Sequence, residues 1–183
     1  LWGQGRKPSF DSFYDRHHVK GAVISAVDLV KGLGICAGME VPDVPGATGN
    51  IDTNYEGKAD AAIAFFLSGG DFVYLHVEAP DECGHRQEIQ NKVRAIEYLD
   101  QRILKKVWDY LENTGEPYRI LVLPDHPTPL ALRTHTHAPV PYMIYEGDRA
   151  GIRSASAEYN ERDAAETGIY IEKGFQLIDR FLS

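Results

Sequence analysis

The sequence predicts an α/β fold with a mostly parallel central sheet that is flanked by helices. Two short runs rich in β-branched and aromatic residues, Phe72–Val77 and Arg119–Leu123, have the composition of buried central strands. The segment between them, residues 86–112, carries apolar residues at the spacing of one helical face. A strand, a helix and a strand in this order indicate a right-handed crossover between parallel strands.

Apolar periodicity and turn residues predict the elements that precede the first of these strands. Val23, Ile24, Val27, Val30 and Leu33 recur at helical spacing and predict a first helix. A short strand is then expected over residues 37–41, followed by a loop rich in proline and glycine over 42–54. Residues 57–67 predict a second helix, because Ala59, Ala62, Ile63 and Phe66 share one face.

The C-terminal part of the chain predicts one more strand and one more helix. Gly115 and Pro117 end the long helix before the strand at 119–123. Residues 140–145 predict a further strand, and residues 174–182 predict a closing amphipathic helix. In such sheets ligands bind beyond the carboxyl ends of the strands, so polar side chains that follow a strand are candidate site residues.

Composition indicates a globular protein and excludes some partners. The 183 residues are 43% hydrophobic and 25% charged, enough for one domain with a substantial core. The net charge of -8 argues against general nucleic-acid binding, which favours a basic face. Phosphorylated substrates remain compatible with this charge, because a bound metal supplies local positive charge. No apolar run approaches the roughly 20 residues that span a bilayer, so no membrane partner is expected.

Two further features concern the compartment and the start of the chain. Cys36 and Cys83 are too few for a disulfide framework, which favours a reducing cytoplasm. Cys83 is either a metal ligand or a small buried side chain, and packing is the simpler interpretation. The chain opens at Leu1 without an initiator methionine, so we expect a fragment of a larger protein.

Three segments near predicted strand ends each supply a histidine. In the first, Asp81 and His85 are four residues apart, so one helical turn places both side chains on the same face. In the second, Asp125 and His126 are adjacent, and neighbouring residues of a strand point in opposite directions. Both serve one site only if the strand breaks there, as the two following prolines allow. In the third, His135 lies in a loop ahead of the strand at 140–145.

Carboxylate oxygens and imidazole nitrogens together suit divalent transition metals such as Mn²⁺ and Zn²⁺. Each block alone has a simpler explanation, because an Asp-x-x-x-His spacing arises by chance and an Asp-His pair before proline is often a capped turn. The occurrence of three such blocks near strand ends favours a metal site, and the ligand set looks like that of a metal-dependent phosphoryl-transfer enzyme.

Five longer segments carry a resemblance to a known family. They are Gly21–Gly32, Val44–Gly49, Asp52–Lys58, His76–Glu82 and Leu123–Pro129. These segments resemble the archaeal-type cofactor-independent phosphoglycerate mutases of the alkaline phosphatase-like superfamily, whose bacterial members are often labelled homoserine kinases. The resemblance runs over nearly the whole chain. It implies an alkaline phosphatase-like α/β fold in which residues 1–183 form the C-terminal portion of the metal-binding catalytic domain.

The resemblance also implies a role for each histidine block. One metal in the family is held by an Asp-x-x-x-His pair and a later histidine, which match Asp81, His85 and His135 here. The later histidine opens a His-Thr-x-x-Pro-Val-Pro pattern, so the match is His135 rather than His137.

The other metal of the family is held by an Asp-His pair that matches Asp125 and His126. It also requires an aspartate and a nucleophilic serine that have no match in this chain. Lys31 loosely matches a lysine that balances charge near the phosphoserine, and a helix-surface lysine is the alternative. Arg6 is a candidate contact for a substrate phosphate or carboxylate, because a guanidinium binds such groups with two hydrogen bonds, and an ordinary surface arginine is the alternative.

The implied reaction interconverts 3-phosphoglycerate and 2-phosphoglycerate through a phosphoserine. It requires two divalent ions, with Mn²⁺ the first expectation and Zn²⁺, Mg²⁺ or Co²⁺ the alternatives, and no 2,3-bisphosphoglycerate. A homoserine kinase would need a nucleotide site, yet the sequence has no P-loop and no kinase signature set. A phosphatase of the same superfamily is a third possibility. We expect the isolated chain to be inactive, and its oligomeric state is not readable from the sequence.

Overall fold

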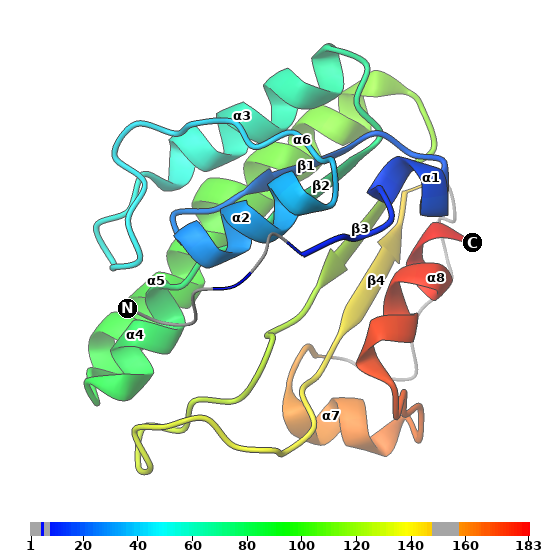
Figure 1. Cartoon of the computed structure of the whole chain (residues 1–183). Helices are drawn as coiled ribbons and strands as arrows, with labels where there is room; N and C mark the ends of the chain where they lie inside the picture. Colours follow the sequence, from blue (N-terminus) through cyan, green and yellow to red (C-terminus); the bar gives the residue numbers. More distant parts are fainter. Residues whose placement is uncertain (1–4, 6–7, 148–157) are drawn as a thin grey trace. The chain divides into compact units, whose positions relative to one another are not determined.

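A computed structural model of the chain describes residues 5, 8–147 and 158–183. The chain divides into two compact units, Leu1–Tyr110 and Leu111–Ser183 (Figure 1). Helices and strands occur in both units, as expected for an α/β protein. None of the helices in the described part of the chain has the length and apolar character needed to cross a membrane.

Unit 1 contains a parallel two-stranded sheet. Strand β1 (Gly21–Ile24) pairs with β2 (Phe72–Leu75), and Gly21 lies opposite Phe72 in the register. The helices that precede and connect these strands are α1 (Phe13–His17), α2 (Asp28–Cys36) and α3 (Tyr55–Leu67). The helical connection between two parallel strands confirms the α/β arrangement that the sequence predicts.

The first predicted helix is wrong in its N-terminal half. Val23 and Ile24 belong to the buried strand β1, and α2 begins only at Asp28. The Ser25 hydroxyl accepts a hydrogen bond from the Val27 amide (3.0 Å), and this local turn separates the strand from the helix. The strand expected over 37–41 is reduced to a single parallel bridge between Ala22 and Glu40.

The helical region after β2 is interrupted. It consists of α4 (Ala79–His85), α5 (Ile89–Tyr98), a π-helical segment (Leu99–Leu104) and α6 (Lys105–Thr114). The long helix predicted over 86–112 therefore starts three residues later, because Gln87 adopts a left-handed conformation (φ 59°) between α4 and α5. Its end is as predicted, since Gly115 follows α6 with a φ of 72°.

The core of unit 1 lies between α3, the sheet and the helices after it. One apolar group contains Tyr55, Ala59, Ala79, Ala95 and Ile103. A second contains Ile24, Val44 and Ala62. Arg102 of the π-helical segment packs against this core. Its guanidinium donates hydrogen bonds to both Glu56 carboxylate oxygens (2.5 and 2.6 Å) and stacks over the ring of Tyr55.

Unit 2 contains an antiparallel pair of strands. β3 (Arg119–Val122) pairs with β4 (Met143–Glu146), and an ion pair of 3.0 Å joins Arg119 and Glu146 at the end of the ladder. The remaining helices are α7 (Glu161–Glu166), a 3₁₀ turn (Gly174–Gln176) and α8 (Leu177–Leu182). The crossover predicted between residues 72–77 and 119–123 thus differs from the described ladders, because each of these strands pairs within its own unit.

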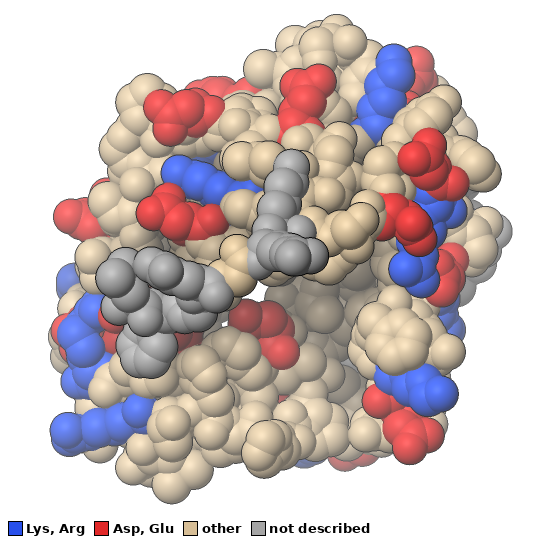
Figure 2. Space-filling view, in the orientation of Figure 1, with Lys and Arg blue, Asp and Glu red and all other residues tan. Residues whose placement is uncertain are grey.

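Charged side chains of both signs are interspersed on the face drawn in Figure 2. Neighbouring opposite charges form ion pairs, within α6 between Lys105 and Asp109 (2.7 Å) and between α6 and α3 from Lys106 to Asp60 (2.6 Å). Such exposed pairs contribute little to stability, and they leave the fold to be held by the apolar groups.

Candidate metal centre

Helix α4 presents Asp81 and His85 on one face. The helix begins just after Glu78 and has proline in its first turn, where a missing amide hydrogen has no consequence. Cys83 is fully buried, whereas the side chains of Asp81 and His85 are 23% and 33% exposed. The His85 Nε2 atom lies 3.2 Å from Asp81 Oδ2, so the predicted spacing does bring the two ligand atoms together.

The buried Cys83 packs on the opposite side of the same helix. Burial, followed by the nearby Glu88 carboxylate, raises the pKa of its thiol and disfavours the thiolate that would bind a metal. This supports the packing role over the ligand role for Cys83.

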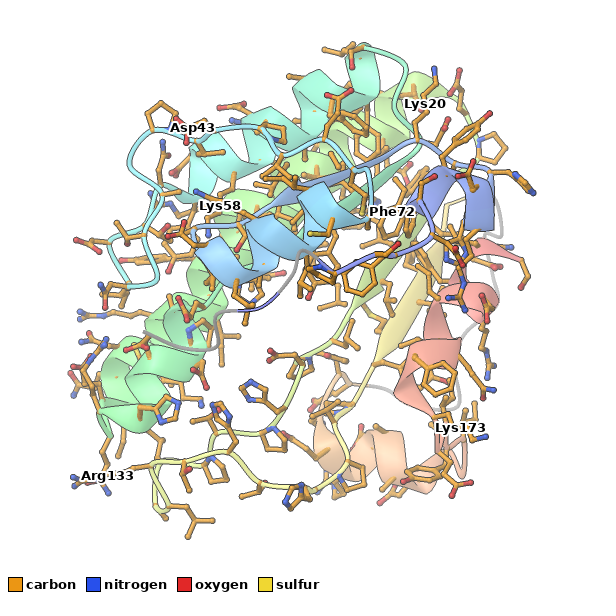
Figure 3. All side chains as sticks on the ribbon, in the orientation of Figure 1. Lys20, Asp43, Lys58, Phe72, Arg133 and Lys173 are labelled. Atoms are coloured by element: carbon orange, nitrogen blue, oxygen red, sulfur yellow. The ribbon has the colours of Figure 1, made fainter. Side chains whose placement is uncertain are left out.

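The turn that leads into α4 is held by a residue that the sequence analysis did not single out. Lys58, labelled in Figure 3, lies in the first turns of α3, and its Nζ donates a hydrogen bond to the His76 carbonyl oxygen (2.9 Å). A signal was present, since Lys58 shares the helical spacing of the buried Tyr55, Ala59 and Ala62. A lysine at an otherwise buried helical position indicates a buried polar contact.

In unit 2, Asp125 and His126 lie where the chain leaves β3. The strand ends at Val122, and residues 125 and 126 form a bend, as predicted from the prolines that follow. The Asp125 carboxylate accepts a hydrogen bond from the His126 amide (3.0 Å), and its other oxygen lies 3.1 Å from His126 Nε2. Thr128 Oγ1 lies 3.4 Å from the second ring nitrogen, Nδ1, and so restrains the rotation of the imidazole.

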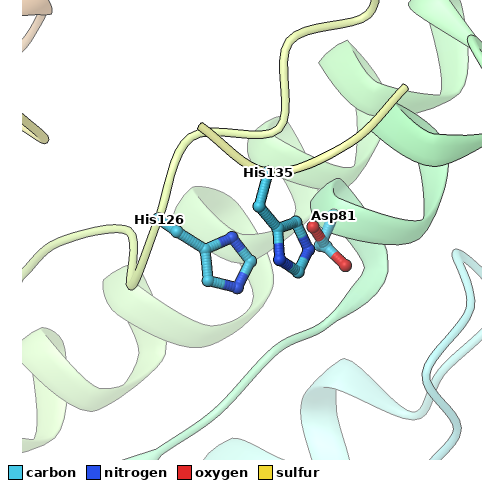
Figure 4. Close-up of side chains that lie close together, drawn as sticks. All are labelled: Asp81, His126 and His135. Atoms are coloured by element: carbon cyan, nitrogen blue, oxygen red, sulfur yellow. The ribbon is translucent and has the colours of Figure 1, made fainter. Parts of the chain in front are cut away.

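The loop of residues 129–137 brings a second histidine beside His126. The rings of His126 and His135 stack with centroids 3.7 Å apart (Figure 4). The Thr136 amide donates to the Pro127 carbonyl (3.1 Å), and the Arg133 amide donates to the Pro129 carbonyl (2.9 Å). These two bonds fold the loop back on itself, which explains why residues nine positions apart are in contact. Figure 4 also draws Asp81, which belongs to α4 of unit 1.

The donor atoms within each unit fit a divalent metal. The carboxylate oxygen and the imidazole nitrogen lie 3.2 Å apart in the pair on α4 and 3.1 Å apart in the pair after β3. Because metal–ligand bonds are about 2.0–2.2 Å long, both atoms of such a pair can reach one ion. Imidazole and carboxylate are donors that Mn²⁺ and Zn²⁺ accept. The residues present are therefore suited to hold metal.

The two remaining candidates differ in what the structure describes. Lys31 lies on α2 and is partly exposed. Burial is the main reason that the pKa of Lys58 is lowered, and the charge of Lys31 acts in the same direction. Arg6 lies outside the described residues.

Residues 1–168 match the family model of the metalloenzyme superfamily. The chain belongs to this superfamily. The chain is 50% identical over 182 residues to the probable 2,3-bisphosphoglycerate-independent phosphoglycerate mutase of Geobacter sulfurreducens. It is 51% identical over 178 residues to the mutase of the same name from Methanothrix thermoacetophila. These alignments cover 100% and 97% of this chain, and the chain spans about 45% of the length of each relative.

Solved structures confirm the fold of this chain. The structure of the PH0037 protein from Pyrococcus horikoshii matches with a TM-score of 0.82 and 30% identity, over 94% of this chain and 50% of that chain. A cofactor-independent phosphoglycerate mutase from Thermoplasma acidophilum matches with a TM-score of 0.64 and 21% identity, over 96% and 39% of the two chains. The latter shows the fold alone. The predicted resemblance and the α/β, alkaline phosphatase-like fold class are thereby confirmed.

Proposed function

We propose that this chain is part of a metal-dependent, 2,3-bisphosphoglycerate-independent phosphoglycerate mutase. The complete enzyme would interconvert 3-phosphoglycerate and 2-phosphoglycerate through a phosphoserine. The names of relatives that are about 50% identical over nearly the whole chain support the reaction. The observation that carries the metal dependence is the pair of carboxylate–imidazole contacts, one on α4 and one after β3.

We assign two sets of ligands within this proposal. Asp81 and His85 hold one ion together with His135, and Asp125 and His126 hold the other. This assignment requires the two units to act as portions of one catalytic domain, as the resemblance implies for residues 1–183. Mn²⁺ is the first expectation, while Zn²⁺, Mg²⁺ and Co²⁺ share the same donor preferences. When bound, the ions would neutralise charge on the transferring phosphoryl group and lower the pKa of the attacking hydroxyl.

The protein's own residues supply preorganisation. The helical turn of α4 holds the Asp81 carboxylate and the His85 imidazole together before any ion binds. Thr128 and Asp125 restrain the His126 ring from opposite sides, which fixes its orientation in the same way.

The proposed reaction implies a small phosphorylated acid as the substrate. The acidic net charge of -8 makes the predicted metal ions the local source of positive charge for such a substrate. Lys31 and Arg6 remain candidates for further contacts with its charged groups. A reducing cytoplasm, expected from the two cysteines, is the compartment of this proposal.

An enolase-coupled assay of the complete gene product tests the proposal. Added Mn²⁺ without 2,3-bisphosphoglycerate should give conversion of 3-phosphoglycerate, and a chelator should abolish it. Phosphate release without isomerisation would indicate a phosphatase instead. A requirement for ATP with homoserine as acceptor would indicate the kinase, and either result would overturn the mutase assignment.

A further inference from the structure

Lys58 is a buried lysine in the core of unit 1. Its side chain is 1% exposed, although it begins on α3 among apolar neighbours such as Ala59 and Ala62. Burying an ammonium group is unfavourable unless the group is hydrogen-bonded and faces a negative charge. Burial lowers the pKa of Lys58 to about 8, while the Glu78 carboxylate acts in the opposite direction.

The hydrogen bond of Lys58 ends at a specific backbone position. Its acceptor is the carbonyl of His76, the first residue after β2. The amide of the same residue donates to the Ile24 carbonyl at the end of β1 (2.8 Å), and its Nδ1 atom lies 3.3 Å from Ser25 Oγ. His76 is thus fixed from two directions, by the end of β1 and by α3.

Two residues later the chain enters the helix that carries the metal ligands. Glu78 immediately precedes α4, and its carbonyl accepts a hydrogen bond from the Asp81 amide (2.9 Å). The Glu78 carboxylate packs against Gly49 so closely that a Cβ atom at that position would overlap it. The turn from β2 to α4 is therefore confined between Lys58 on one side and the loop at Gly49 on the other.

We propose that Lys58 is a positioning residue that fixes the turn between β2 and α4 and thereby aims Asp81 and His85 at a divalent cation. This inference rests on the proposed metal function. Lys58 acts through the His76 carbonyl and touches neither ligand. The groups behind metal ligands orient them, and their loss typically weakens metal affinity by about 10- to 100-fold.

Calorimetric titration of Mn²⁺ into the chain tests this role. Lys58→Met removes the charge and the donor at similar length, and Lys58→Gln keeps a donor that is too short to reach the same carbonyl. Both variants should bind Mn²⁺ more weakly than the unchanged chain, by roughly twofold to tenfold, which is less than the loss typical of a group that contacts a ligand directly. Lys105→Met, on the exposed side of α6, is the matched control and should bind with unchanged affinity.

Each variant is first measured by thermal unfolding without metal, because a purely structural lysine would change stability and leave the affinity of the folded chain unchanged. Wild-type affinity in a folded Lys58→Met or Lys58→Gln variant would overturn the inference. Both are also made on a Gly32→Ala background, where the new methyl group meets open space and should stabilise α2, so that folded protein can be titrated. If the unchanged chain binds no Mn²⁺, the same variants are compared in the complete gene product. Absence of binding there as well would mean that the metal function itself fails, and this inference with it.

Discussion

His135 is a proposed metal ligand, whereas His137, two residues later in the same loop, is not. His135 stacks on His126 at 3.7 Å, which places its ring beside another proposed ligand of the same unit. His135→Ala should therefore weaken Mn²⁺ binding by at least about tenfold in a calorimetric titration. His137→Ala, at a position that is also exposed in the loop, is the matched control and should leave binding unchanged. Equal losses in the two variants would contradict the assignment.

Lys58 also predicts a pH dependence of stability. Its pKa is about 8 in the folded chain, compared with 10.5 ordinarily, under the influence of burial, Glu78 and Lys31. Between these values the unfolded chain binds more protons than the folded chain, so the free energy of unfolding should rise with pH. Between pH 8 and 10.5, the free energy of unfolding should rise by on the order of 1–3 kcal/mol more in the unchanged chain than in the Lys58→Met variant. Denaturant unfolding of metal-free protein measures this difference, and a flat difference would show that the lysine keeps its ordinary pKa.

The site residues that the sequence predicts best are those whose contact is local. Asp81 and His85 follow from helical geometry alone, because a spacing of four residues places them on one face. The contact of His126 with His135 was not predictable, since it depends on how the intervening loop folds back. Lys58 was missed although it shares the helical spacing of the apolar residues, because lysine side chains are rarely fully buried.

At the scale of elements, two glycines of α2 provide opposite tests of how the helix packs on β1. A Cβ atom at Gly34 would lie 2.8 Å from Val23 Cγ2, and valine has little freedom to move away. Gly34→Ala should therefore destabilise the chain by about 1–3 kcal/mol. A Cβ atom at Gly32 meets nothing within 4 Å, so Gly32→Ala should stabilise by about 0.5–1 kcal/mol through helix propensity. Equilibrium unfolding in denaturant measures both, and the same sign for both would contradict the packing.

The elements that the sequence predicts correctly carry signals at both ends or along one face. Helix α3 has a clear apolar stripe, an Asn54 side chain that caps its first turn, and glycines just beyond its end. Strand β1 was misassigned because Val23 and Ile24 are apolar and β-branched, and a run of four residues fits a strand and a helical stripe equally well. Tertiary pairing with β2 decides between the two, and periodicity does not contain that information.

At the scale of the whole molecule, the chain spans about 45% of the length of the two relatives compared above. The activity of the isolated chain is therefore a separate question from that of the complete protein. The nucleophilic serine and the further aspartate implied by the resemblance have no match in these 183 residues. The isolated chain should therefore show no mutase turnover in the enolase-coupled assay, even with Mn²⁺ present. Measurable turnover by the purified chain would require a different nucleophile.

The complete gene product offers the matching loss-of-function test. Asp125→Asn preserves the size of the side chain but removes the negative charge that an ion requires. We expect activity to be abolished while the circular dichroism spectrum and the unfolding midpoint are retained. A near-normal rate would show that Asp125 does not hold a metal.

The most direct measurement of the central claim is anomalous diffraction from crystals of the complete gene product soaked in Mn²⁺. We predict two anomalous peaks, which mark one ion bound by Asp81, His85 and His135 and a second ion bound by Asp125 and His126. Ligand distances near 2.0–2.2 Å would support the assignment. Peaks located elsewhere, or none at these side chains in protein that is active, would contradict it.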